Sequence, residues 1–394
     1  MLETEVTFFY PCGPILTGQE LASKLILELL ADGKYRFQTV KLPVFDRSKS
    51  WSIVHLFCFL AQIANVWWRF LTLIFKRRPI AYLNLGQSLK AMVCDGLPFY
   101  LCSFLKSDMK CVISLHGQFF LNWQVNELRL RLFTMILKRA SLITVLGDPQ
   151  KNKLVALGID ASEIHIVNNT CEFKAQTIQT SSAKQDCINL LYLSNLIEAK
   201  GYKNYLSALL QISRISDFTT RIHAVLCGRL VTTSLDTHKT NTDVDNDKWI
   251  RQTIETINKS GFIKITWVEG AYGNDKESLF NNADIFVYPS NIDAQPIVLI
   301  EAMAAGCATI CSGIGEIPTM VGDSAVILSR VDIEEVAAAI IHLVGNDNRR
   351  INLARAARKR FEQYFSQQVY ATRWENIFTE ITMDNLASDR GISC

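Results

Sequence analysis

Short apolar runs alternate with longer helical patterns along the whole chain of 394 residues. The runs occupy residues 6–10, 80–85, 112–115 and 142–145 in the first part, and 190–193, 222–226, 263–268, 285–288 and 308–311 in the second. This alternation is typical of βαβ units, in which helices connect parallel strands and cover the sheet. The sequence therefore predicts an α/β fold built on doubly wound parallel sheets.

The chain is longer than one hydrophobic core usually supports, so two domains are expected. Residues 174–186 are rich in Ser, Thr and Gln and lack apolar periodicity, which predicts a linker. We expect one α/β domain over residues 1–173 and another over 187–365. Residues 366–394 should form a terminal helix and tail, because Tyr370, Trp374 and Phe378 recur at helical spacing and must pack on another element.

Composition narrows the function classes. Hydrophobic residues make up 49% of the chain and charged residues 20%, which indicates a globular protein. The net charge of +3 gives no support for nucleic-acid binding. The 11 cysteines are scattered without a C-x-x-C pair, which suggests neither a zinc site nor disulfides. The N-terminus is acidic and lacks a signal-peptide pattern, so a reduced, cytoplasmic protein is expected.

Residues 51–78 form a long apolar stretch that could span a membrane by length alone. Four polar residues interrupt it, however, and a span would divide the first domain between its strands. A helix lying on a membrane surface is the preferred functional interpretation. It would turn aromatic side chains to lipid and basic ones to headgroups: Trp67, Trp68 and Phe70, and Arg69, Lys76, Arg77 and Arg78. The alternative is an ordinary core-packing helix with a solvated basic end.

The stretch TNTDVDNDKW, residues 240–249, carries three closely spaced aspartates that suggest a metal site. A calcium-binding loop would need a glycine where Lys248 stands and a glutamate further on, and neither is present. We therefore expect a solvated surface loop here and no metal site.

Ligands of doubly wound sheets bind beyond the carboxyl ends of the strands, where helix N-termini direct unpaired N–H groups at anions. The loop after the first strand carries Gly13 and Gly18, which allow close backbone approach, and Thr17, which can cap the helix or donate to a ligand. His116 follows the strand at 112–115, where it can bond a polar substrate and titrate near neutral pH. A tight turn and a structural histidine are the respective alternatives.

Two further loops belong to the second half of the chain. Lys200 precedes a glycine and a helix, a position that suits a diphosphate, although a solvated lysine is the alternative. After the strand at 285–288, Asp293 lies in a loop and a helix begins near Pro296. The amides of Ile297 and Val298 should then be available to a phosphate. Glu301, one turn into this apolar helix, can accept two sugar hydroxyls.

These motifs resemble the retaining family-4 glycosyltransferases over nearly the whole chain. The segments that carry the resemblance, in the family's order, are GPILTGQELA, SLHG, ITVLGDPQKNKLVALGI, IHIVNN, LLYLSNLIEAKGYKNYLSAL, ADIFVYPS and IEAMAAGCATICSGIGEIP. The resemblance implies the GT-B architecture, in which two Rossmann-like domains face each other and a C-terminal helix crosses back. It also implies a metal-independent hexosyltransferase that uses a UDP- or GDP-linked sugar and needs no cofactor.

The resemblance also assigns roles to individual residues. Glu301 matches the acid that holds the donor ribose, and Asp293 takes the place of the acid near the transferred sugar, where the family more often has glutamate. Lys200 matches the lysine that neutralises the diphosphate, whereas Asn195 stands where an arginine is usual. His116 matches a histidine near the donor sugar. The Ser-Asn-Leu-Ile form around Asn195 resembles the branch that builds bacterial surface polysaccharides.

The resemblance places Gly13, Thr17 and Gly18 in the loop that closes over phosphate and acceptor, with Gly18, Ile297 and Val298 beside the diphosphate. The first domain would bind the acceptor, a glycan or lipid-linked glycan of O-antigen, lipopolysaccharide or capsule synthesis, and the second the nucleotide sugar. The enzyme would work in the cytoplasm, on the inner face of the plasma membrane if residues 51–78 bind lipid.

Two other functions stay open. The changes at Asp293 and Asn195 are also consistent with a catalytically silent homologue that acts as a binding partner or scaffold. A nicotinamide-dependent enzyme of the same general fold would need a G-x-G-x-x-G fingerprint with an acid about 20 residues further on, and the sequence lacks it.

Overall fold

The structure is a computed structural model that describes residues 4–13, 18–31, 34–43, 53–173, 187–215, 220–231 and 243–387. It divides into two compact units. Unit 1 comprises residues 1–170 and 367–394, and unit 2 comprises residues 171–366. The predicted linker at 174–186 lies outside the described residues.

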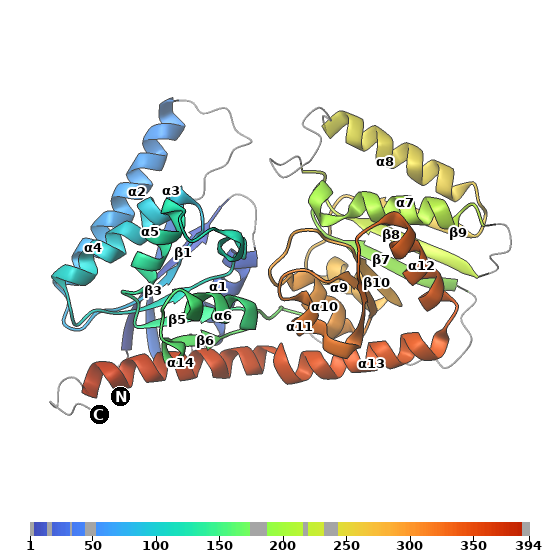
Figure 1. The fold of residues 1–394 in the computed structure, drawn as a ribbon. Coiled ribbons are helices and arrows are strands. Elements are labelled where there is room, and N and C mark those ends of the chain that lie inside the picture. Colours follow the sequence, from blue (N-terminus) through green and yellow to red (C-terminus); the bar gives the residue numbers. More distant parts are fainter. Residues whose placement is uncertain are drawn as a thin grey trace. The chain divides into compact units, whose positions relative to one another are not determined.

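Unit 1 is built on a parallel six-stranded sheet in the order β2-β1-β3-β4-β5-β6. Its strands are β1 Thr4–Cys12, β2 Tyr35–Pro43, β3 Ile80–Asn84, β4 Lys110–Ser114, β5 Leu142–Val145 and β6 Ile164–Ile166. Its helices are α1 Gly18–Leu29, α2 Ile53–Ile74, α3 Leu89–Ala91, α4 Leu97–Leu105, α5 Leu128–Leu137, α6 Asp148–Ala156 and α14 Gln367–Ala387. A π-helical segment, η1 Met92–Gly96, joins α3 to α4 (Figure 1).

Unit 2 repeats the design in the order β12-β11-β10-β7-β8-β9. Its strands are β7 Cys187–Leu193, β8 Arg221–Cys227, β9 Ile263–Val268, β10 Ile285–Tyr288, β11 Ala308–Ser312 and β12 Ala325–Leu328. Its helices are α7 Tyr202–Ile212, α8 Asp243–Asn258, α9 Gly273–Asn281, α10 Ile297–Ala305, α11 Ile317–Val321, α12 Ile333–Val344 and α13 Asp347–Tyr364. The predicted α/β fold with parallel sheets is therefore observed in both units.

The C-terminal helix α14 completes the core of unit 1. Its Trp374 is 1% exposed and meets Tyr82 of β3 edge to face at 5.5 Å between ring centroids. Tyr82 in turn stacks on Phe8 of β1 at 4.0 Å. The apolar stripe seen in the sequence is thus buried against the sheet, and because large aromatic side chains dominate core energetics, we expect α14 to be essential for the stability of unit 1.

Two sequence-based expectations are wrong, one about α2 of unit 1 and one about α8 of unit 2. Phe70, expected to face lipid, is fully buried and stacks on Phe9 of β1 at 4.0 Å, whereas Trp68 is exposed. The reason is geometric, because residues two apart on a helix point about 200° apart. The aspartate-rich stretch at 240–249, expected to be a loop, is helical from Asp243 onward as the start of α8, and residues 240–242 lie outside the described residues. In this helix Asp247 pairs with Arg251 at 2.8 Å.

Candidate functional site: the carboxyl edge of each sheet

The strand order of unit 2 creates a crevice between β7 and β10. From β7 the chain winds outward through β8 and β9 on one side, and through β10, β11 and β12 on the other. The loops that follow β7 and β10 therefore leave the sheet in opposite directions, and such a topological switch point is where open α/β sheets bind ligands. The first loop carries Lys200 and the second carries Asp293.

Backbone contacts hold these two loops together. The amide of Asn291 donates to the carbonyl of Ala199 at 2.8 Å and so joins the two loops. The hydroxyl of Tyr192 on β7 donates to the carbonyl of Lys200 at 3.0 Å and fixes the first loop to its own strand. Gly201, with φ of 83°, allows this approach, because a Cβ atom there would lie 2.0 Å from the carbonyl oxygen of Pro289. The glycine after Lys200 is thus required by the close contact with the end of β10.

Lys200 and Asp293 form an ion pair at this crevice. The Nζ atom of Lys200 lies 2.6 Å from both carboxylate oxygens of Asp293. The same carboxylate also accepts from the hydroxyls of Tyr288 at 2.6 Å and Ser290 at 3.0 Å. Asp293 is therefore fixed by three donors in a mostly buried position. Sequence analysis had given Lys200 and Asp293 separate roles, and the structure brings them together.

The N-terminus of α10 adds positive potential to this unit. Pro296 is its N-cap residue and offers no side-chain cap. Among the described residues, no hydrogen bond engages the amides of Ile297 and Val298, which are the first two of the helix. These amides, together with the helix dipole, favour an anionic ligand at this end of α10.

Glu301 is buried, with 3% of its surface exposed. This agrees with the expectation from the sequence that its side chain does not face solvent. Its Oε1 lies 2.5 Å from Nζ of Lys276 on α9. Its Oε2 is buried and has no hydrogen-bond partner among the described residues. Burial raises the pKa of Glu301, and the Lys276 ammonium opposes that shift. The helix thus holds one carboxylate oxygen with unused acceptor capacity, a costly arrangement that a ligand hydroxyl could relieve.

Sequence analysis missed three residues of this set, Lys276, Tyr288 and Ser290. Tyr288 and Ser290 lie at the end of the strand and start of the loop that it did identify, and their polar groups next to Asp293 were a usable signal. Lys276 lies in the polar first half of α9, GNDKESLFN, where nothing in the pattern separates it from solvated neighbours.

Asn195, which was expected beside a diphosphate, is exposed, and its carbonyl accepts from the amide of Ile197 at 2.8 Å.

His116 lies at the carboxyl edge of the unit 1 sheet, as expected, but its chemistry differs from the expectation. Its Nε2 lies 3.1 Å from the Ser114 hydroxyl and its Nδ1 lies 3.2 Å from Oδ1 of Asn169. Burial lowers the pKa of His116 to about 4, with the Asn169 bond acting in the opposite direction. The prediction that His116 titrates near neutral pH is therefore wrong, and the ring is neutral at physiological pH.

This depressed pKa should make stability pH-dependent. The unfolded chain protonates His116 near its ordinary pKa of 6.5, whereas the folded protein does so only near 4. Lowering the pH from about 7 to about 5 should therefore reduce the free energy of unfolding by about 2 kcal/mol through this residue. Urea denaturation of wild type and His116→Gln at both pH values checks this, and the variant should lose that part of the dependence. Identical pH slopes would contradict it.

The loop after β1 is only partly described. Thr17 lies outside the described residues, and Gly18 is the exposed first residue of α1. The amide of Gly13, expected to approach a phosphate, donates to the Glu20 carboxylate at 3.3 Å. Glu20 is itself buried and pairs with Lys24 at 2.9 Å. A carboxylate at this position disfavours a phosphate on the Gly13 amide, which sequence analysis did not foresee.

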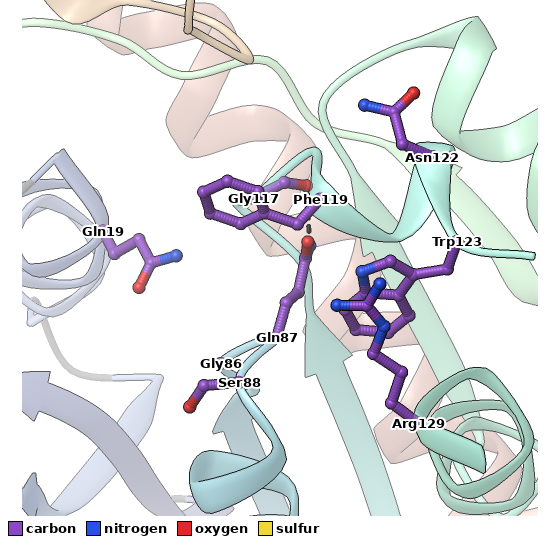
Figure 2. Close-up of a pocket in the computed structure, with 9 residues that line it drawn as sticks. All are labelled: Gln19, Gly86, Gln87, Ser88, Gly117, Phe119, Asn122, Trp123 and Arg129. Carbon is purple, nitrogen blue, oxygen red and sulfur yellow. Dashed lines mark hydrogen bonds between the residues drawn. The ribbon is translucent and has the colours of Figure 1, made fainter. Parts of the chain in front are cut away.

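A pocket of about 550 Å³ opens at the switch point of unit 1, beside the loops that follow the neighbouring strands β1 and β3. Figure 2 shows Gln19 of α1 on one side and Asn122, Trp123 and Arg129 on the other. Its remaining lining residues are Gly86, Gln87, Ser88, Gly117 and Phe119. The side-chain amide of Gln87 donates to the Gly117 carbonyl at 2.7 Å, which fixes the position of the Gln87 side chain in the pocket. Aromatic rings with amide groups around them are suited to a polar ligand that has apolar faces.

The chain has the GT-B fold, which the sequence resemblance predicted. A solved structure of HepE from Anabaena in complex with UDP covers 96% of this chain and all of its own, with a TM-score of 0.67 and 16% identity. At that identity the likeness establishes the fold alone. Residues 174–360, just under half of the chain, match the family model "Glycosyl transferases group 1", and the match falls within unit 2.

Curated relatives carry related names. The chain is 25% identical over 257 residues to the capsular polysaccharide biosynthesis glycosyltransferase CapM of Staphylococcus aureus, covering 64% of this chain and 58% of CapM. It is 28% identical over 137 residues to the O-antigen chain mannosyltransferase B of Escherichia coli, covering 34% of this chain and 32% of that enzyme. The matches thus span less than two thirds of either relative.

Proposed function

We propose that this protein is a glycosyltransferase that moves a sugar from a nucleoside-diphosphate sugar to a glycan or lipid-linked acceptor. The observation that carries the proposal is the set of groups at the carboxyl edge of the unit 2 sheet. These are a lysine at the switch point, two helix amides and a buried glutamate oxygen, and neither the amides nor that oxygen has a hydrogen-bond partner in the part of the chain that the structure describes. The glycosyltransferase family match covers the same residues.

Each group has a role in the proposal. Lys200 and the amides of Ile297 and Val298 bind the diphosphate, and the Glu301 carboxylate accepts from the ribose hydroxyls. Asp293 faces the transferred sugar. The bond between the anomeric carbon and the diphosphate breaks with its electron pair staying on the phosphate oxygen. The acceptor oxygen bonds to the same carbon and passes its proton to that departing phosphate oxygen. The developing negative charge is met by Lys200 and the helix dipole.

The same groups motivate the finer proposals. A cation and two amides can neutralise the leaving diphosphate, so we propose that transfer needs neither a metal ion nor a cofactor. We also propose retention at the anomeric carbon, by attack on the face that the diphosphate leaves. The presence of UDP in the HepE structure makes a uridine donor the first to test, with a GDP-linked sugar as the alternative.

We place the acceptor in the pocket of unit 1. Sugar rings stack on aromatic side chains and bond amides through their hydroxyls, and the pocket offers Phe119 and Trp123 beside Gln19 and Asn122. The names of the two relatives favour a surface polysaccharide such as capsule or O-antigen. Such acceptors are lipid-linked, so we propose that the enzyme works at the cytoplasmic face of a membrane.

A thermal-shift titration with UDP, GDP, ADP, CMP and NAD tests the function. A ligand at about 100 times its Kd should add about 2.7 kcal/mol of stability. We expect a shift with one nucleoside diphosphate, followed by EDTA-insensitive consumption of the matching sugar donor. Absence of any shift would favour the silent scaffold, and a shift with NAD alone would contradict the proposal.

A further inference from the structure

Helix α2 carries an apolar stripe that the rest of unit 1 does not cover. Its members are Phe57, Leu60, Trp68 and Leu71 of the helix and Phe75 directly after it, and they lie three, eight, three and four residues apart. Trp68 is 63% exposed and Phe75 is 89% exposed. From Phe57 to Phe75 the stripe covers 19 residues, or about 27 Å at the rise of an α-helix. The opposite face of α2 is also apolar, and there Val66, Phe70 and Leu73 are buried in the core.

The neighbouring helical segment from α3 through η1 to α4 continues this surface. It packs along α2, with the Lys90 ammonium 3.7 Å from the ring centroid of Phe59. Its exposed apolar residues are Leu89, Val93, Leu101, Phe104 and Leu105. Ten of the twenty exposed large hydrophobic side chains in the described part of the chain thus fall between residues 57 and 105. Such a concentration of exposed apolar side chains on adjoining helices indicates an interaction surface, whereas single exposed apolar residues scattered over a protein do not.

The charge of this segment identifies its partner. Residues 53–106 contain six basic residues and one acidic residue, Asp95, which is buried. Their net charge is +5 in a chain whose total is +3, so the remainder carries −2. Arg139 adds a further cation 4.3 Å from the ring centroid of Phe104. An apolar surface with this charge fits an anionic partner, and two copies of it would repel each other.

The stripe ends at a basic pocket. Lys76, Arg77 and Arg78 directly follow the exposed Phe75, and they line a pocket of about 390 Å³. Lys76 is paired with Glu5 at 2.8 Å, whereas Arg77 is exposed. Apolar and aromatic side chains along a helix with arginine beside them suit the boundary between acyl chains and headgroups.

We propose that α2 and α4 together form the surface through which this protein lies on an anionic lipid bilayer. The inference deepens the proposed function, since it supplies the membrane that a lipid-linked acceptor would require. It also changes the membrane-facing residues that sequence alone suggested, because Phe70 belongs to the core and Phe104 and Leu105 join the surface. Residues 57–74 have a mean hydropathy of 1.4, so this helix is long and apolar enough to cross a membrane by length and composition. One face of α2 packs on the sheet, however, which favours a helix lying on the membrane surface.

Vesicle co-sedimentation of the full chain tests the proposal. Wild type should bind vesicles of phosphatidylglycerol and phosphatidylcholine, and bind phosphatidylcholine alone weakly. The double variants Trp68→Gln/Phe75→Gln and Phe104→Gln/Leu105→Gln should each lower binding at least about tenfold through lost apolar burial. Arg77→Gln should lower it about fivefold in dilute salt. All these residues except the partly packed Phe104 ring are open to solvent, so folding should be retained.

The matched control is Val244→Gln/Tyr272→Gln, which removes two side chains of similar exposure from unit 2. It should bind vesicles as wild type does. The vesicle assay contains no sugar donor, and the nucleotide thermal-shift titration contains no lipid. Either proposal can therefore fail while the other stands.

Three results would overturn the inference. The first is equal vesicle binding by wild type and both double variants. The second is a wild-type dimer that the double variants convert to monomers, which would make this face a self-association surface. The third is full-length protein that stays in membranes after alkaline carbonate extraction, because a helix lying on the surface is released and a spanning helix is not.

Discussion

Replacing Glu301 by glutamine is expected to weaken binding of the nucleoside diphosphate by two to three orders of magnitude. Glu301 offers a buried oxygen that no described residue bonds, and two hydrogen bonds from ribose hydroxyls to a carboxylate contribute about 3–4 kcal/mol together. At about 1.4 kcal/mol per factor of ten, that loss gives the stated range. Isothermal titration calorimetry with the nucleotide found by thermal shift measures it.

Two controls separate this role from general damage. Glu362→Gln removes another ion-paired glutamate of unit 2, one that is solvated and pairs with Arg358 at 2.7 Å, and it should leave nucleotide affinity unchanged. Lys276→Met removes the cation that opposes the rise in the pKa of Glu301. The Glu301 carboxyl of this variant should then stay neutral to a higher pH than in wild type, so the pH above which the nucleotide binds tightly should shift upward. Wild-type affinity in Glu301→Gln would show that the ribose lies elsewhere.

The sequence predicted all eight central strands of the two sheets but only one of the four edge strands, β9. Six of the nine predicted strands, including residues 142–145 and 285–288, agree with the structure at both ends or within one residue. The three strands that were missed, β2, β6 and β12, are all edge strands. An edge strand is less fully buried, so polar residues interrupt its apolar run. β2, YRFQTVKLP, illustrates this, because its charged and polar residues hide the strand from a search for apolar runs.

The candidate site was predicted residue by residue rather than as an arrangement. Lys200 and Asp293 are 93 positions apart, and only the adjacency of β7 and β10 brings them together. Sequence patterns carry no information about that strand order. The same limit applies to α2, whose apolar residues cover its whole circumference. Only the packing of Phe70 on Phe9 shows which side faces the core.

Asp293→Asn is expected to raise affinity for the nucleoside diphosphate about tenfold and to lower turnover of the sugar donor by about two orders of magnitude. In the structure, both oxygens of Asp293 lie 2.6 Å from the Lys200 ammonium, so a diphosphate must compete with this carboxylate for the lysine. Asparagine keeps an acceptor for Tyr288 and Ser290 but removes the competing charge.

Lys200→Met is the companion variant for this test, because it removes the cation itself. Affinity and turnover should both fall, since no charge then meets the diphosphate in the ground state or as it leaves. Calorimetry and steady-state kinetics on the two variants separate a carboxylate that acts on the sugar from one that only holds the lysine in place. If Asp293→Asn binds the diphosphate more weakly than wild type does, the ion pair organises the site and Asp293 acts through the position of Lys200. The sign of that one change in affinity therefore decides between a role at the sugar and a role in positioning.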